Sequence, residues 1–217
     1  MLFGIDLWYL VLVIAVILVS VTLHEAMHAY VSYWLGDDTA KAQGRLTLNP
    51  IAHIDPFLSL LLPLALALMG LPIFGGAKPV PFNPAMVRYG EFGAALVGVA
   101  GPLTNFLLAF LCFGAFAISG VGASSTVGQV LLLAVQVNLG FFIFNMIPIP
   151  PLDGSRVLYA LAPDGARRVM EAIERYGVFL VFAIVLVASP LIGSFMLGAM
   201  RFFLGIFSWV FGISVVL

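Results

Sequence analysis

The chain has 217 residues, of which 63% are hydrophobic and only 9% are charged, and its mean hydropathy is +1.17. Soluble domains are about half apolar and about a quarter charged, so this composition excludes a soluble protein and predicts one embedded in a lipid bilayer. Nine Lys and Arg residues against ten Asp and Glu residues leave no basic excess for nucleic acid. The only cysteine, Cys112, excludes a disulfide framework and a multi-cysteine metal site.

The first half of the chain begins with an apolar run at residues 7–35. This run is long enough for a membrane span, because crossing requires about 20 helical residues. Residues 37–55 are polar, and the alternation in RLTLN at 45–49 predicts a short strand. The apolar run at 57–71 is short for a span and contains a proline, and residues 72–84 are too rich in proline for a helix.

The second half of the chain contains apolar runs at residues 88–118 and 129–147, and each of them predicts one span. Residues 177–217 are apolar apart from Arg201 and are interrupted by Pro190. This last stretch predicts either two spans or one span with an interfacial helix.

The placement of the basic residues predicts how the chain crosses the membrane. Eight of the nine lie in the segments 37–55, 72–88 and 154–175, whereas the loop 119–127 carries no charge. Since cytoplasmic loops carry the Lys and Arg excess, we expect these three segments in the cytoplasm and the N-terminus outside. Residues 56–84 must then leave and return on one side of the membrane, which predicts a re-entrant segment.

These features predict an all-α polytopic membrane protein. We expect a bundle of about four to six membrane helices with a re-entrant segment and short strands on the cytoplasmic side. No internal repeat or low-complexity linker divides the chain, so we expect a single domain over residues 1–217. Within it, a core at about 7–160 carries the candidate catalytic residues, and residues 177–217 form C-terminal membrane helices.

The sequence HEAMH at 24–28 places two histidines four residues apart on the first predicted helix. Side chains at this spacing project from one face, so His24 and His28 can bind one zinc ion, and Glu25 can take a proton from water. Zinc would lower the pKa of that water to about 7 and polarise a peptide carbonyl, which suits amide hydrolysis. The alternative is a pair of core histidines beside an unrelated glutamate. Ionisable residues inside a span cost about 2.5–3.5 kcal/mol each, however, and are usually functional.

Two histidines leave a zinc ion one protein ligand short, and Asp153 is the best candidate for the third. It follows a span that we expect to end on the cytoplasmic side. His28 lies seven residues before Leu35, roughly 10 Å inside the cytoplasmic end of its own helix, so both groups are predicted at a similar depth. His53 is a candidate fourth ligand, an outer partner of a ligand or a turn-capping residue. We favour the last two roles, because a catalytic zinc needs an open coordination position.

Three motifs together resemble the site-2 protease family of intramembrane zinc metalloproteases: HEAMH at 24–28, AGPLTN at 100–105 and NMIPIPPLDG at 145–154. The resemblance covers about residues 7–160. It implies regulated intramembrane proteolysis, the hydrolysis of peptide bonds in or near transmembrane segments of membrane protein substrates.

The resemblance also implies roles for individual residues and a location. It implies one Zn²⁺ per chain bound by His24, His28 and Asp153, with Glu25 as the catalytic glutamate. Asn145 would donate a hydrogen bond to the substrate or to the oxyanion. The chain has no room for a PDZ insert and resembles the compact bacterial or archaeal subgroup, so we expect a multi-pass protein of the cell membrane with its active site towards the cytoplasm.

Two other functions fit parts of the same pattern. A divalent-metal transporter would need polar residues along a path through several helices, whereas the candidate residues here cluster at one predicted depth. A catalytically inactive membrane scaffold is disfavoured because the glutamate between the two histidines is present.

The sequence AKPVPFN at 77–83 is a candidate for binding an unwound substrate. In an extended segment its prolines fall on one edge, so the N–H groups of Val80 and Phe82 would remain free on the other edge to pair with substrate. We therefore expect Lys78, Val80 and Phe82 to be substrate-binding residues. The alternative is a proline-rich turn that merely links two membrane segments.

Small residues recur in the apolar run that contains AGPLTN, at Gly98, Gly101 and Thr104. Small side chains let the backbones of neighbouring membrane helices approach closely. We expect close helix packing at these positions, with direct substrate contact as the alternative.

Overall fold

The computed structural model describes residues 7–55, 61 and 78–213, and the long regular elements in this part of the chain are all helices. Four of them are long and apolar enough to cross a membrane. They are α1 (Leu7–Trp34), α5 (Gly90–Ser119), α6 (Thr126–Asn145) and α10 (Ser189–Phe211). The predicted all-α membrane bundle is confirmed for the described residues, with four helices of spanning length.

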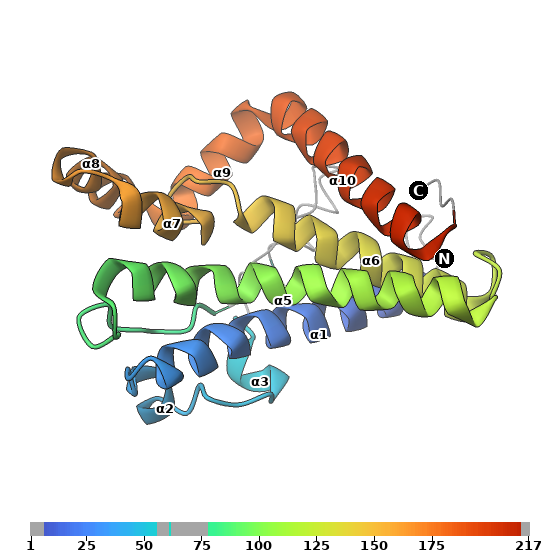
Figure 1. The fold of residues 1–217 in the computed structure, drawn as a ribbon, viewed down its shortest axis with the longest axis horizontal. Helices are drawn as coiled ribbons and strands as arrows, with labels where there is room; N and C mark the ends of the chain where they lie inside the picture. The colour runs from blue at the N-terminus through green and yellow to red at the C-terminus, as the bar shows by residue number, and fades with distance from the viewer. Residues whose placement is uncertain (1–6, 56–60, 62–77, 214–217) are drawn as a thin grey trace.

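The helices α1, α5 and α6 run side by side, and α5 contacts both of the others (Figure 1). α10 lies at an angle beside these helices and contacts α5 and α6 (Figure 1). Between these three helices, phenyl rings pack with centroids 5.0–5.9 Å apart. The rings of this aromatic cluster belong to Phe106, Phe110, Phe113, Phe142, Phe203, Phe207 and Phe211.

Short helices gather at one end of the bundle, on the left in Figure 1. α2 (Thr39–Ala42) and α3 (Pro50–His53) follow α1, while α7 (Gly154–Leu161) and α8 (Asp164–Glu174) follow α6. The start of α5 lies at the same end, where the Arg88 guanidinium donates hydrogen bonds to the carbonyls of Trp34, the last residue of α1, and of Leu35. The basic segments therefore share one end of the bundle, as the charge pattern predicted.

The C-terminal apolar stretch forms two helices of unequal length. α9 (Gly177–Val187) has 11 residues, which extend for only about 16 Å, against a hydrocarbon thickness of about 30 Å. α10 has 23 residues and is long enough to cross. Of the two predicted arrangements, the described residues favour one span preceded by a shorter helix.

The strand predicted at residues 45–49 is wrong, and the structure has no strand among its described residues. The backbone turns instead of extending, because Asn49 caps the N-terminus of α3 and the Thr47 carbonyl accepts a hydrogen bond from the ring of His53. The predicted re-entrant segment, 56–84, falls largely on residues that the structure does not describe. Its last part, 78–83, has no regular secondary structure and belongs to no sheet.

Candidate metal centre

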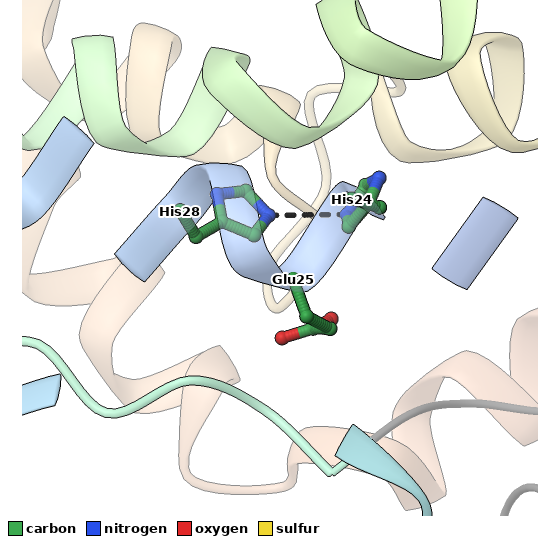
Figure 2. Close-up of side chains that lie close together, drawn as sticks. All are labelled: His24, Glu25 and His28. Atoms are coloured by element: carbon green, nitrogen blue, oxygen red, sulfur yellow. Dashed lines mark hydrogen bonds between the residues drawn. The ribbon is translucent and has the colours of Figure 1, made fainter. Parts of the chain in front are cut away.

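His24 and His28 lie one turn apart on α1, and both side chains are buried. Figure 2 shows the two rings on one side of the helix, with their Nε2 atoms 3.0 Å apart. The ring planes are nearly perpendicular, with centroids 4.7 Å apart. The spacing of four residues has thus produced the shared face predicted from the sequence.

The opposite nitrogen of each ring faces an acceptor on α5. His28 Nδ1 lies 2.7 Å from the carbonyl oxygen of Val97, and His24 Nδ1 lies 2.5 Å from Asn105 Oδ1. A carbonyl oxygen only accepts, so each Nδ1 carries a hydrogen and donates it. In a neutral ring, the Nε2 atoms that face each other then have free lone pairs.

Asp153 brings a third acceptor to the same place. Its Oδ2 lies 3.1 Å from His24 Nε2 and 3.5 Å from His28 Nε2. Asp153 immediately precedes α7, which packs closely against α5 because Gly98 has no side chain. A Cβ at Gly98 would lie 3.0 Å from the Asp153 carbonyl oxygen and 2.9 Å from Arg156 Cβ.

These three atoms fit one zinc ion. Two ligands at about 2.0–2.1 Å from a tetrahedral ion lie about 3.3–3.4 Å apart. The separations of 3.0, 3.1 and 3.5 Å among His24, His28 and Asp153 are close to that value. Gly101 leaves room on the α5 side, since a Cβ there would lie 2.4 Å from His28 Nε2 and 2.6 Å from His24 Nε2.

Glu25 lies beside the two histidines but points away from the side of α1 that carries the rings (Figure 2). The ligand atoms of His24, Glu25 and His28 lie within 4.8 Å of one another, so this group too could hold a metal ion. One carboxylate oxygen of Glu25, Oε2, already accepts a hydrogen bond from the Val80 N–H at 3.0 Å. Because its ligand atom lies within 4.8 Å of those of the histidines, the Glu25 carboxylate can reach a metal ion at this place or a water molecule beside the ion.

The segment 78–83 lies against Glu25, and hydrogen bonds of its backbone groups hold it in place. The Lys78 N–H donates to the His53 carbonyl at 3.0 Å, and the Lys78 carbonyl accepts from the Arg45 guanidinium at 2.5 Å. The expectation that the Val80 N–H is free is wrong for this structure, because Glu25 accepts from it. The Val80 side chain is buried next to α1 and α2.

Other predicted site residues lie outside the group of three acceptors. His53 is fully buried and its Nε2 donates to the Thr47 carbonyl at 2.9 Å, so it stabilises the turn before α3. Asn145 donates from Nδ2 to the Phe141 carbonyl on its own helix at 3.0 Å. The ring of Phe82 lies 5.6 Å below the Arg156 guanidinium.

Three buried polar residues near the histidines were not predicted from the sequence to be site residues. These are Ser20, Asn105 and Asn138, one from each of α1, α5 and α6. Their signal in the sequence is a polar side chain inside an apolar run, which in a membrane is costly and usually functional.

Comparison with known proteins identifies relatives along most of the chain. The family model described as Peptidase family M50 matches residues 114–189, which include Asp153. YwhC of Bacillus subtilis, named as a zinc metalloprotease, is 44% identical over 191 residues, which are 85% of this chain and 83% of YwhC. Rip2 of Mycolicibacterium smegmatis, also named as a zinc metalloprotease, is 30% identical over 205 residues, 94% of this chain and 74% of Rip2.

Rip2 of Mycobacterium tuberculosis is 33% identical over 209 residues, again 94% of this chain and 74% of Rip2. No solved structure matches the chain significantly. The two Rip2 proteins match 94% of this chain, and the residues matched by the family model include Asp153. The chain therefore belongs to the site-2 protease family, peptidase family M50.

Proposed function

We propose that this chain is a zinc metalloendopeptidase that hydrolyses peptide bonds in or near transmembrane segments of membrane proteins. One observation carries the proposal. Three acceptor atoms of His24, His28 and Asp153 converge within 3.5 Å beside the carboxylate of Glu25, inside a bundle of helices long enough to cross a membrane. Membership of the site-2 protease family supports the same activity.

His24, His28 and Asp153 would hold one zinc ion per chain. When bound, zinc supplies Lewis-acid activation of water and of the scissile carbonyl. Glu25 takes the proton of the attacking water on its carboxylate and delivers it to the leaving amine. Before substrate binds, the hydrogen bond from the Val80 N–H to Oε2 orients that carboxylate. Asn145 would donate to the oxyanion, which requires its Nδ2 to leave the Phe141 carbonyl.

A helical substrate must unwind locally before its carbonyls can be attacked, because they are already hydrogen-bonded within the helix. We place the unwound segment along residues 78–82, with contacts to Lys78, Val80 and Phe82. The bond between Val80 and Glu25 must then open or share its donor as substrate binds. A photo-crosslinking side chain at Phe82 should capture uncleaved substrate, and one at exposed Phe92 should not. Equal capture at both positions would disprove this placement.

The active site would face the cytoplasm of a bacterial or archaeal cell, because the basic segments share the end of the bundle next to the site. Single cysteines test this in protein whose Cys112 has been replaced. Lys41→Cys should resist an impermeant thiol reagent in intact cells, and Ser124→Cys should react with it. The opposite pattern would reverse the orientation.

Glu25→Gln tests the mechanism. It removes the base and keeps the size of the side chain, so the purified variant should retain about one zinc per chain and lose cleavage. A suitable probe is a fusion protein with a single transmembrane segment that contains helix-destabilising residues. Loss of zinc from a folded Glu25→Gln variant would make Glu25 a ligand, as the group of His24, Glu25 and His28 allows. Cleavage at the wild-type rate would refute the proposed role of Glu25 altogether.

A further inference from the structure

A network of buried hydrogen bonds that begins at His24 joins the membrane helices α1, α5 and α6. Asn105 on α5 accepts from His24 through Oδ1 and donates from Nδ2 to Asn138 Oδ1 at 2.8 Å and to the Ser20 carbonyl at 3.3 Å. Asn138 on α6 donates from Nδ2 to Ser20 Oγ at 2.9 Å and to the Ala134 carbonyl at 2.9 Å. No side chain of Ser20, Asn105 or Asn138 is more than 3% exposed.

The direction of these hydrogen bonds follows from the backbone carbonyls at which the series ends. The backbone carbonyls of Ser20 and Ala134 can only accept, so the Nδ2 group of each asparagine must face its carbonyl. The amide oxygen of Asn138 then faces Asn105, and the amide oxygen of Asn105 faces His24. His24 must therefore carry its hydrogen on Nδ1 and present a lone pair at Nε2.

Asp153 competes for the same hydrogen from the other side of the ring. Its Oδ2 lies 3.1 Å from His24 Nε2, within reach of a hydrogen on that nitrogen. A hydrogen bond there would join His24 to Asp153, and a cation could bind His24 Nε2 or Asp153 Oδ2 only by breaking it. An acceptor held at Nδ1 removes this competing arrangement.

We propose that Asn105, positioned by Asn138 and Ser20, fixes the tautomer of His24 so that Nε2 stays open for the metal. This inference rests on the zinc site of the proposed function. Asn105 and Asn138 are positioning residues: the hydrogen bond to Nδ1 sets which nitrogen faces Asp153. Because this network is buried, it fixes the position of Asn105 more strongly. An amide that lost its hydrogen-bond partners would be costly within the membrane.

Zinc affinity, measured by competition with a chelator on purified protein, tests the inference. Asn105→Leu removes the acceptor at similar volume and should weaken zinc binding by about 10–100-fold, the usual effect of losing a partner of a ligand. Asn138→Leu acts only through Asn105, so it should give a smaller loss, and the double variant should be no weaker than Asn105→Leu. Thr104→Val is the matched control, because the Thr104 hydroxyl bonds only within its own helix, to Ala100.

Asn105→Asp separates positioning from packing. A carboxylate still accepts from His24 Nδ1, so zinc affinity should exceed that of Asn105→Leu. Its thermal stability should nevertheless fall, because the second oxygen faces the Ser20 carbonyl. If Asn105 only stabilised the fold, Asn105→Leu would retain zinc and Asn105→Asp would bind zinc less well than Asn105→Leu. That reverse order would overturn the inference.

The tautomer can also be observed without zinc. The chain has three histidines, so ¹⁵N labelling gives few ring signals in metal-free protein at a pH where the rings are neutral. His53 is an internal reference, since it donates from Nε2 to Thr47. His24 should carry its hydrogen on Nδ1 in the wild type and on Nε2 in Asn105→Leu, and an unchanged tautomer would refute the inference. Wild-type protein that binds no zinc would instead refute the proposed function, which this readout does not require.

Discussion

The two sides of α5 pack by different chemistry. Towards α1 and α7 the helix presents Gly98 and Gly101, which bring its backbone close to the candidate ligands. It also presents Asn105, which accepts a hydrogen bond from His24 and donates one to the Ser20 carbonyl. Towards α10 it presents phenyl rings such as those of Phe110 and Phe113, which make only apolar contacts. One helix thus separates a polar half of the bundle, which we call the catalytic half because it holds the proposed metal ligands, from an aromatic half.

The difference shows how each half constrains its helices. Apolar side chains in a bilayer gain little by leaving lipid, so aromatic packing allows neighbouring helices some rotation and sliding. A hydrogen bond in the same medium has few alternative partners and therefore fixes rotation as well as distance. We expect changes in the catalytic half to alter zinc binding, and changes in the aromatic half to alter stability alone.

Gly101→Ala should have the largest effect on the catalytic half. The new methyl group would lie 2.4 Å from His28 Nε2 and 2.6 Å from His24 Nε2, so the histidines or α5 must move. We expect zinc affinity to fall by at least about 100-fold, which is the upper end of the effect of losing a hydrogen-bond partner of a metal ligand. Cleavage should be lost as well. Gly205→Ala on α10 is the control, because a Cβ there meets no neighbour within 4 Å. Zinc binding at the wild-type level in Gly101→Ala would show that α5 adjusts freely.

Asp153→Ala and His53→Ala distinguish a ligand from a residue that stabilises a turn. Asp153 contacts both histidine Nε2 atoms, so its removal should release zinc from folded protein. His53→Ala should retain zinc, because the contacts of its ring are with Thr47 and Arg45. Metal analysis after gel filtration measures both. Retention by Asp153→Ala with loss by His53→Ala would assign the third ligand to His53.

The sequence predicted those features of the molecule that depend on neighbouring residues. Hydrophobicity identified the spans, since a lipid-facing helix is apolar over its whole length, and the spacing of four placed His24 and His28 on one face. The recurrence of small residues predicted the close approach at Gly98 and Gly101, which the structure confirms.

Contacts between segments that are distant in the sequence could not be predicted from the sequence pattern. The bond of Asn105 to His24 joins residues 81 positions apart and depends on how two helices rotate against each other. Likewise, alternation at 45–49 suggested a strand, but a strand requires a partner, and the backbone groups there bond within the turn instead. The Val80 N–H was expected to be free because nothing local indicated that Glu25 would accept from it.

Phe207→Ala tests the aromatic half. The ring is fully buried and packs against Phe106, Phe110 and Phe113, so its removal should destabilise the fold by about 1–3 kcal/mol through lost contacts. Zinc affinity of the folded protein should not change. Thermal unfolding in detergent and chelator competition measure the two effects, with the exposed Trp209→Ala as control. Weakened zinc binding in Phe207→Ala would mean that the two halves are coupled.

The smallest expected effect is a pH dependence at the loop end of the catalytic half, where Asp37 follows α1. Burial by itself would raise the pKa of Asp37, but hydrogen bonds from Thr39, Asn83 and Ser32 outweigh it and lower the pKa below its usual 3.8. A lowered pKa in the folded state stabilises the protein above the usual value, and this stabilisation is lost as the pH falls through the lowered pKa. The wild type should therefore keep this stabilisation from neutral pH down to about pH 5 and lose it as the pH falls below 3.8. Asp37→Asn should be less stable at neutral pH and lose less on acidification, while exposed Asp38→Asn should follow the wild type. Parallel pH profiles for Asp37→Asn and the wild type would show that the carboxylate of Asp37 does not stabilise the loop through its charge.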